Sequence, residues 1–178
     1  MNYLGRAVFL DRDGVLNRRA AEGSYIVSLS EFELLPGSLG AIAKLCAHGW
    51  QVFLATNQRG IARGMVSADV VAQIHRWLLE QVRREGGRIT QVYVCPHDYS
   101  DLCYCRKPNP GMLLRAAREH SLDLANSWMV GDSIPDVQAG RAAGCKTAYV
   151  GERQCEIADV QVPSLQAFVE QLLQRNET

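Results

Sequence analysis

The sequence predicts a single α/β domain over residues 1–178, with a parallel sheet covered by helices on both faces. Three observations predict it. Short apolar runs alternate with longer segments of helical periodicity, as in successive strand–helix–strand units. A chain of 178 residues can build one domain with a real core and is too short for two ordinary ones. With 47% hydrophobic and 21% charged residues, the composition is typical of globular proteins.

Five segments are predicted to be strands, because each is a short apolar run between turn or helix signals. They are Ala7–Leu10, Gln51–Ala55, Gln91–Cys95, Ser127–Val130 and Lys146–Val150. The helical segments between and after them account for the rest of the chain, so we expect a five-stranded parallel sheet.

The predicted helices have recognisable starts and stops. The clearest has Ser67 as its N-cap and carries an apolar stripe at helical spacing until Gly86 ends it. Another begins at Pro110, a favoured first helical residue. In chain order, helices are expected over Ser38–Ala47, from Ser67 to Gly86, from Pro110, from Asp132 or Ser133 as N-cap, and from Ser164.

Two segments do not fit this alternation. Val15–Glu33 follows the first strand and is long enough for a small hairpin or flap, and Cys95–Lys107 follows the third strand. Ligands of open α/β sheets bind at the carboxyl ends of strands. Both segments begin at such ends, so we expect the functional site there.

Charge and hydropathy exclude several classes of protein. The 19 Lys and Arg residues balance the 19 Asp and Glu residues, which disfavours a dedicated nucleic-acid binder but allows a local basic pocket. No apolar run is long enough to span a membrane, and no secretory signal is recognised. We therefore expect a cytoplasmic protein without membrane or nucleic-acid partners. Nothing marks an oligomer interface, so a monomer is expected.

The first strand runs directly into Asp11-Arg12-Asp13-Gly14. Burying an unpaired carboxylate is costly, and the period of a strand points Asp11 and Asp13 the same way. They would repel each other unless a cation lay between them. This pattern favours a Mg²⁺ site with one carboxylate free for covalent chemistry and the other for proton transfer. The motif alone leaves open the alternative of a solvated turn.

Three further polar groups occur in order along the chain. The first offers a hydroxyl and amides that could hold a phosphoryl group, the second offers two cations, and the third two acids. Each alone has an ordinary alternative: a capping threonine, an exposed basic pair and a capped helix start. Their position at successive strand ends favours one shared site. The groups are Thr56-Asn57-Gln58, Arg106-Lys107-Pro108, and Asp132 with Asp136.

The order Asp-x-Asp-Gly, Thr-Asn, Lys-Pro, Gly-Asp-x-x-x-Asp resembles the four motifs of haloacid-dehalogenase (HAD) superfamily phosphatases. The resemblance implies a Rossmann-like HAD fold, and short segments at both cap insertion points imply a capless enzyme with only a flap. More narrowly, residues 9–14, 56–64 and 95–108 resemble the subgroup of heptose-bisphosphate and histidinol-phosphate phosphatases. The heptose enzymes of this subgroup serve the synthesis of lipopolysaccharide-core heptose.

The resemblance implies a role for each motif residue. Asp11 attacks phosphorus to form an aspartyl-phosphate, and Asp13 protonates the leaving alcohol and later activates water. Asp13 must then hold a proton while Asp11 is ionised. Thr56 and Lys107 hold the phosphoryl oxygens. The Mg²⁺ ligands are Asp11, the backbone carbonyl of Asp13, and Asp132, with Asp136 orienting them rather than binding directly.

Four residues in the second irregular segment form the ligand set of a closed structural Zn²⁺ site. The alternative is a set of unliganded thiols. A closed site has no open coordination position, so we expect it to stiffen the loop that carries Arg106 and Lys107. Its loop Asp98–Leu102 is shorter than is common in the subgroup, which affects one wall of the pocket. The four residues are Cys95, His97, Cys103 and Cys105.

We expect a phosphorylated sugar as substrate. Arg106 would contact a distal group such as a second phosphate, because its planar fork suits phosphate oxygens. Arg59 and Ser133 depart from the subgroup's pattern and are further candidate contacts. Alternatives are a histidinol-phosphate phosphatase, a polynucleotide 3′-phosphatase and a catalytically dead, zinc-stabilised binding domain. Candidate contacts to sugar hydroxyls are Ser24, Tyr25, Asn57 and Gln58.

Overall fold

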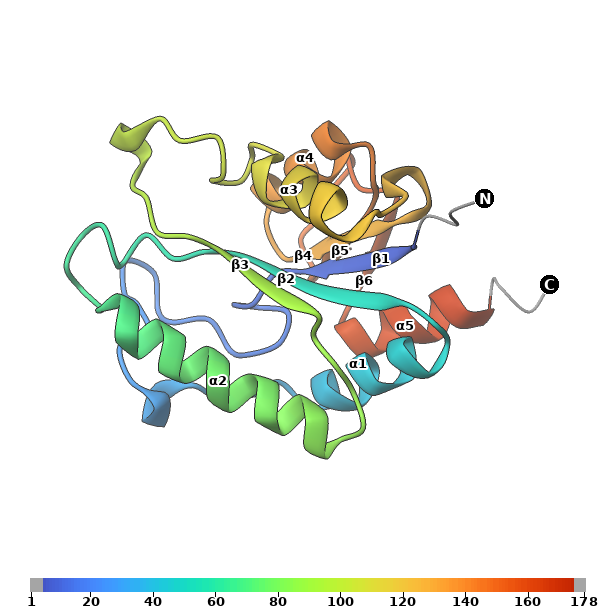
Figure 1. Ribbon diagram of the computed structural model, residues 1–178, viewed down its shortest axis with the longest axis horizontal. Helices are drawn as coiled ribbons and strands as arrows, with labels where there is room; N and C mark the ends of the chain where they lie inside the picture. The colour runs from blue at the N-terminus through green and yellow to red at the C-terminus, as the bar shows by residue number, and fades with distance from the viewer. Residues whose placement is uncertain (1–4, 175–178) are drawn as a thin grey trace.

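The computed structural model describes residues 5–174, in which six parallel strands form one sheet (Figure 1). Residues 1–4 and 175–178 of the predicted domain lie outside the described residues. The strands lie in the order β3-β2-β1-β4-β5-β6. They are β1 (Ala7–Leu10), β2 (Gln51–Asn57), β3 (Gln91–Cys95), β4 (Trp128–Gly131), β5 (Lys146–Val150) and β6 (Val160–Val162).

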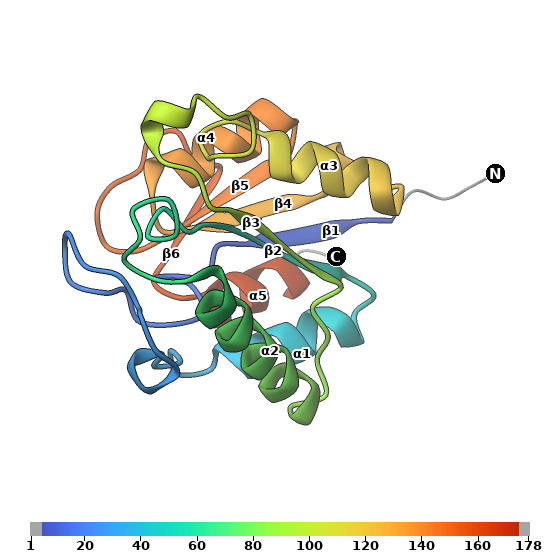
Figure 2. The same cartoon turned by 60° about the vertical axis from the view of Figure 1, so that its left-hand side comes forward.

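Five α-helices within residues 5–174 cover both faces of the sheet, as Figures 1 and 2 show. Helices α1, α2 and α5 pack on one face, and α3 and α4 pack on the other. Short 3₁₀ turns occupy 29–31, 99–101 and 124–126. The helices are α1 (Ser38–Ala47), α2 (Ala68–Arg84), α3 (Gly111–His120), α4 (Ile134–Ala143) and α5 (Leu165–Gln174).

The central strand β1 shows how the sheet is buried on both sides. Val8 and Leu10 belong to the core beneath α1, α2 and α5, whereas Ala7 and Phe9 belong to the core beneath α3 and α4. All four side chains are fully buried. Because side chains alternate along a strand, the next residue, Asp11, continues on the Ala7 and Phe9 side. It therefore meets the segments that lead into α3 and α4.

The structure confirms the α/β class and the parallel sheet but corrects the strand count from five to six. Strand β6 was missed because it has only three residues, one of them Gln161, and forms no recognisable apolar run. Helix α3 begins at Gly111, with Pro110 as its N-cap rather than its first residue. Strand β2 continues two residues beyond the predicted end, to Asn57. Of the described helices, none is both long and apolar enough to cross a membrane.

Strands β1 and β4 are neighbours, and the chain leaves the sheet centre in opposite directions from them. Such a point opens a crevice at the carboxyl ends of the strands. The segment 15–33 returns over this edge as a flap: Asn17 pairs with Leu34, and the Arg18 amide donates to the Glu33 carbonyl at 2.8 Å. The flap and the loop after β3 border the same crevice.

Candidate active site

A cavity of about 410 Å³ lies at the carboxyl edge of the sheet. The end of β1, the flap, the loop after β2, the cysteine-containing loop and the start of α4 all contribute to its wall. Asp11, Asp13 and Lys107 lie on the sheet side of the wall, and the flap contributes Ser24 and Tyr25. Most predicted site residues therefore come together in its wall, although Thr56 and Asp132 do not line this cavity.

Asp11 belongs to a buried ion cluster. The Lys107 ammonium lies 2.8 Å from Asp11 Oδ1 and 2.5 Å from Asp136 Oδ1, and it donates to the Ala55 carbonyl at 2.7 Å. Burial raises the pKa of Asp11 to about 6, against the opposing effect of Lys107. Burial alone would lower the pKa of Lys107, but the two carboxylates raise it above its usual value. Lys107 is thus a fixed cation beside the candidate nucleophile.

Asp13 has a different set of partners. The buried Arg12 guanidinium donates to both of its oxygens, at 2.9 and 3.0 Å, and the side-chain amides of Asn17 and Gln58 add donors at 2.9 and 3.0 Å. Although burial acts in the opposite direction, these contacts hold the pKa of Asp13 below its usual value. In the free chain, the pKa of Asp13 therefore lies below that of Asp11, which is the opposite of the expected order. The expectation did not include the contact with Arg12.

Asp132 lies at the end of β4 and faces Arg19 of the flap. Arg19 Nη2 donates to Asp132 Oδ1 at 2.6 Å, and its Nε lies 2.5 Å from Oδ2. Burial raises the pKa of Asp132 to about 7. Gly14 has a φ of 90°, and a Cβ there would collide with the Asp132 carboxylate. This glycine therefore provides both the turn after Asp13 and the space for the acid.

Carboxylate oxygens of Asp11, Asp132 and Asp136 lie within 4.8 Å of one another. Oxygen donors at this spacing suit Mg²⁺. Asp136 is already engaged elsewhere: besides its contact with Lys107, its Oδ2 accepts from the Ser133 amide at 3.0 Å and from the Ser133 hydroxyl at 2.5 Å. The bond from the Ser133 amide belongs to the capping box of α4. Ser133, a candidate substrate contact, is thus an N-cap that lines the cavity.

The polar residues of β2 mostly bind other protein groups. Both ends of the Asn57 amide bind the Lys107 backbone, at 3.1 Å each. Thr56 is fully buried, and its hydroxyl accepts from the Gln58 amide at 2.8 Å. Asn57 therefore fixes the position of Lys107 rather than offering a free amide to a sugar, and Gln58 links Thr56 to Asp13.

One wall of the cavity is basic and aromatic. The guanidinium carbons of Arg59 and Arg106 lie 4.7 and 4.3 Å from the centre of the Tyr99 ring. Arg59 also donates to the Tyr25 hydroxyl at 3.2 Å, and Arg106 donates to the His97 carbonyl at 3.2 Å. The buried Nε of Arg106 has no hydrogen-bond partner among the described residues. Both arginines line the cavity, where they can meet an anion.

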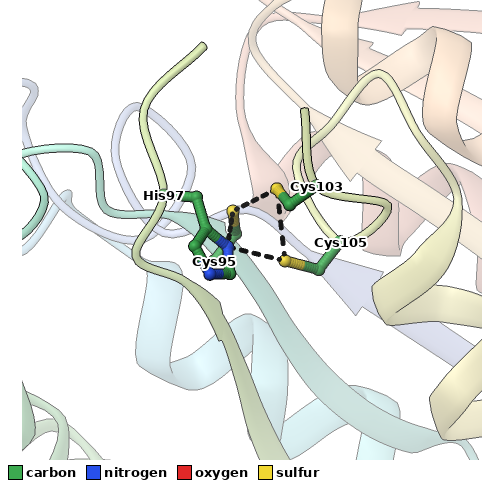
Figure 3. Close-up of side chains that lie close together, drawn as sticks. All are labelled: Cys95, His97, Cys103 and Cys105. Carbon is green, nitrogen blue, oxygen red and sulfur yellow. Dashed lines mark hydrogen bonds between the residues drawn. The ribbon is translucent and has the colours of Figure 1, made fainter. Parts of the chain in front are cut away.

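The four predicted zinc ligands surround a common centre, as Figure 3 shows. Cys95 Sγ lies 3.6 Å from both His97 Nδ1 and Cys103 Sγ, and Cys105 Sγ lies 3.2 Å from His97 Nδ1 and 3.5 Å from Cys103 Sγ. Zinc–sulfur bonds of about 2.3 Å at tetrahedral angles separate ligand atoms by about 3.8 Å. Three thiols and one imidazole at these separations fit Zn²⁺.

Three residues of the site were not predicted from the sequence. Arg12 was missed because strand alternation puts it on the opposite side from Asp13, until the turn at Gly14 brings the two together. Its neighbour His75 is buried 3.2 Å away, and burial lowers its pKa to about 3. Arg19 lies on the irregular flap, where no periodicity indicates its direction. The one available signal was the arginine between the two acids.

Comparisons with known proteins agree with this arrangement. A family model described as HAD-hydrolase-like matches residues 104–173. A D-glycero-β-D-manno-heptose-1,7-bisphosphate 7-phosphatase from Pseudomonas aeruginosa is 44% identical over 80% of this chain and 79% of its own. One from Bordetella bronchiseptica is 40% identical over 95% of this chain and 98% of its own. A crystal structure of the D,D-heptose 1,7-bisphosphate phosphatase from B. bronchiseptica, complexed with magnesium and phosphate, has a TM-score of 0.87 at 39% identity. It covers 96% of this chain and 99% of that one.

Proposed function

The chain belongs to the D-glycero-D-manno-heptose-1,7-bisphosphate 7-phosphatase family of HAD-like hydrolases, and we propose that it removes the C7 phosphate from D-glycero-D-manno-heptose 1,7-bisphosphate. In this proposal the product serves the synthesis of lipopolysaccharide-core heptose. The observation that carries the proposal is the Asp11 carboxylate, which lines the cavity beside Lys107 and close to Asp132.

Asp11 Oδ attacks phosphorus while the heptose C7 oxygen leaves, and the resulting aspartyl-phosphate is then hydrolysed by water. Lys107 neutralises charge on the phosphoryl group and holds Asp11 in place. Asp11, the Asp13 carbonyl and Asp132 would hold Mg²⁺, which supplies further positive charge to the transferring group. The alternative of a dead phosphatase fold is disfavoured, because Asp11, Asp13 and Lys107 line the cavity and the Asp132 carboxylate lies close to Asp11.

Asp13 donates a proton to the leaving oxygen and recovers one from the attacking water. Its low pKa in the free chain comes largely from Arg12 and from the amides of Asn17 and Gln58. A dianionic phosphoryl group placed beside Asp13 raises the pKa of its carboxyl, because like charges disfavour ionisation. Arg12 and Gln58 then keep the carboxyl aimed at the leaving oxygen.

Arg59 and Arg106 favour a bisphosphate over the other candidate substrates. The two guanidinium groups share the Tyr99 ring, and both arginines line the cavity that Asp11 also lines. A second phosphate would bind between positive charges there. Histidinol phosphate carries an ammonium instead, which this wall would repel. A single basic wall in a chain of zero net charge also disfavours an oligonucleotide.

We propose that the cysteine cluster binds structural Zn²⁺ and holds the loop that carries Arg106 and Lys107. Its donor types and separations support this assignment. All six cysteines are free, which fits the reducing cytoplasm, where we place the reaction. The proposal treats the chain as a monomer.

The test measures phosphate release with and without Mg²⁺ from both anomers of the heptose 1,7-bisphosphate, from histidinol phosphate and from a 3′-phosphorylated oligonucleotide. We expect Mg²⁺-dependent release from a heptose bisphosphate at the highest kcat/KM. Asp11→Asn should abolish release and the phosphoenzyme, whereas the exposed control Asp69→Asn should not. Substantial activity of Asp11→Asn, or a preference for histidinol phosphate, would overturn the assignment.

A further inference from the structure

Arg19 makes contacts that no other cation among residues 5–174 makes in this structure. Its Nη2 and Nε hold both oxygens of Asp132, at 2.6 and 2.5 Å, and its Nε also lies 3.5 Å from the backbone oxygen of Asp13. Asp132 and the Asp13 carbonyl are two of the three groups to which we assign Mg²⁺. The guanidinium therefore lies against the oxygens that the metal ion would need.

A guanidinium that holds both Asp132 oxygens competes with a divalent cation for this carboxylate, because it occupies lone pairs that face the site and the two positive charges repel each other. We propose that Arg19 is an intramolecular competitor of Mg²⁺, so that the flap must release Asp132 before the metal ion binds. This inference rests on the metal site of the proposed function. It adds a device that couples the position of the flap to the affinity for the metal.

The flap is built to hold Arg19 close to the site. Its base is fixed, because the Asn17 side chain donates to Asp13 at 2.9 Å and Asn17 pairs with Leu34 on the returning segment. Arg19 lies two residues beyond this anchor, so its guanidinium is present at a high effective concentration. Its side chain is 52% exposed, so it can swing into water at little cost.

Gly14 supplies the space for this contact. A Cβ at this position would collide with Asp132 Oδ2 and lie 3.1 Å from Arg19 Nε. Ser24 and Tyr25, which lie beyond Arg19 on the same flap, line the cavity. When Arg19 leaves Asp132, the flap loses its ion pair with the residue that follows β4. The step that admits the metal ion therefore also loosens the wall of the substrate cavity that the flap forms.

The test measures Mn²⁺ binding by electron paramagnetic resonance and Mg²⁺ binding by calorimetry, without substrate, in wild type and Arg19→Gln. We expect a Kd about five-fold lower in Arg19→Gln, the change expected when a partly exposed ion pair no longer competes. Arg18→Gln is the matched control: it removes the same charge from the adjacent residue, which pairs with Glu33 at 3.0 Å and not with Asp132. Its Kd should stay close to that of wild type.

Arg19→Lys should give an intermediate Kd, because an ammonium keeps the charge but not the fork. An unchanged or higher Kd in Arg19→Gln, or an equal decrease in Arg18→Gln, would overturn the competition. If wild type binds Mn²⁺ and hydrolyses the bisphosphate but Arg19→Gln binds no tighter, this inference fails and the proposed function stands. If wild type neither binds Mn²⁺ nor releases phosphate, both fail.

Discussion

Replacing Lys107 by Met tests whether one buried cation holds the site together. The Lys107 side chain is 2% exposed, and its ammonium contacts Asp11, Asp136 and the Ala55 carbonyl. Met fills a similar volume, so little packing is lost. The variant instead leaves two buried carboxylates and a carbonyl without their donor.

Removing one partner of a buried ion pair costs about 3–5 kcal/mol. A domain of this kind has a free energy of unfolding of about 5–15 kcal/mol in total, so the loss should be large. The cost should depend on pH, because a carboxyl that takes up a proton no longer needs a counter-ion. The pKa of Asp11 is already raised to about 6 with Lys107 present. Removing Lys107 should raise the pKa of Asp11 further.

We therefore expect Lys107→Met to lower the free energy of unfolding by about 3 kcal/mol near pH 8 and by clearly less near pH 5.5. The assay is urea unfolding in a chelating buffer, followed by tryptophan fluorescence. Lys44→Met is the control, because Lys44 is 55% exposed and makes one long contact with Glu170, at 3.9 Å. A loss below about 1 kcal/mol, or an equal loss at both pH values, would refute the reasoning.

Three other changes probe separate parts of the molecule. Cys103→Ser should lower the zinc content measured by elemental analysis and lower the Tm; full stability without zinc would remove the structural site. Burial raises the pKa of Asp132 to about 7, above its ordinary value in the unfolded chain. The protonated carboxyl therefore contributes fully to the free energy of unfolding below about pH 4, and this contribution is lost as pH rises through 7. In a chelating buffer the free energy of unfolding should then fall between about pH 6.5 and pH 8. His75, which is neutral in the folded chain, offsets only part of this fall, because its pKa in the unfolded chain lies near 6.5; a net rise would contradict the prediction. Gly131→Ala should cost about 1–3 kcal/mol, because the new Cβ would collide with Asp136, which is buried; denaturant unfolding would show an unchanged midpoint if that side chain could move aside.

Much of the fold and the meeting of the motifs could be predicted from the sequence. Five strands are apolar runs long enough to recognise, and the carboxyl ends of parallel strands must meet at one edge. That rule alone brings Asp11, Lys107 and Asp132 together. Strand β6 escaped because three residues carry too little pattern, and its place in the sheet depends on pairing with β5.

The pairing of polar groups inside the site could not be predicted. Asn57 was expected to contact a sugar, but its side chain holds the Lys107 backbone. Arg12 and Arg19 lie where the chain leaves regular structure, and no periodicity fixes a side chain's direction there. The pKa order of Asp11 and Asp13 depends on those partners, so the motif alone gave the opposite order.

The loop after β2 is hydrogen-bonded to the cysteine-containing loop at the edge of the sheet. The backbone amide of Gln58 donates to the Cys95 carbonyl at 2.7 Å, and the backbone amide of Ala62 donates to the Pro96 carbonyl at 3.2 Å. Gln58 in turn holds Asp13. Edge loops open locally at a lower free energy than the whole domain needs to unfold. Warming should thus inactivate the enzyme while its central strands are still folded. If the proposed zinc site holds this loop, its four ligands rather than the hydrophobic core would set the operating temperature.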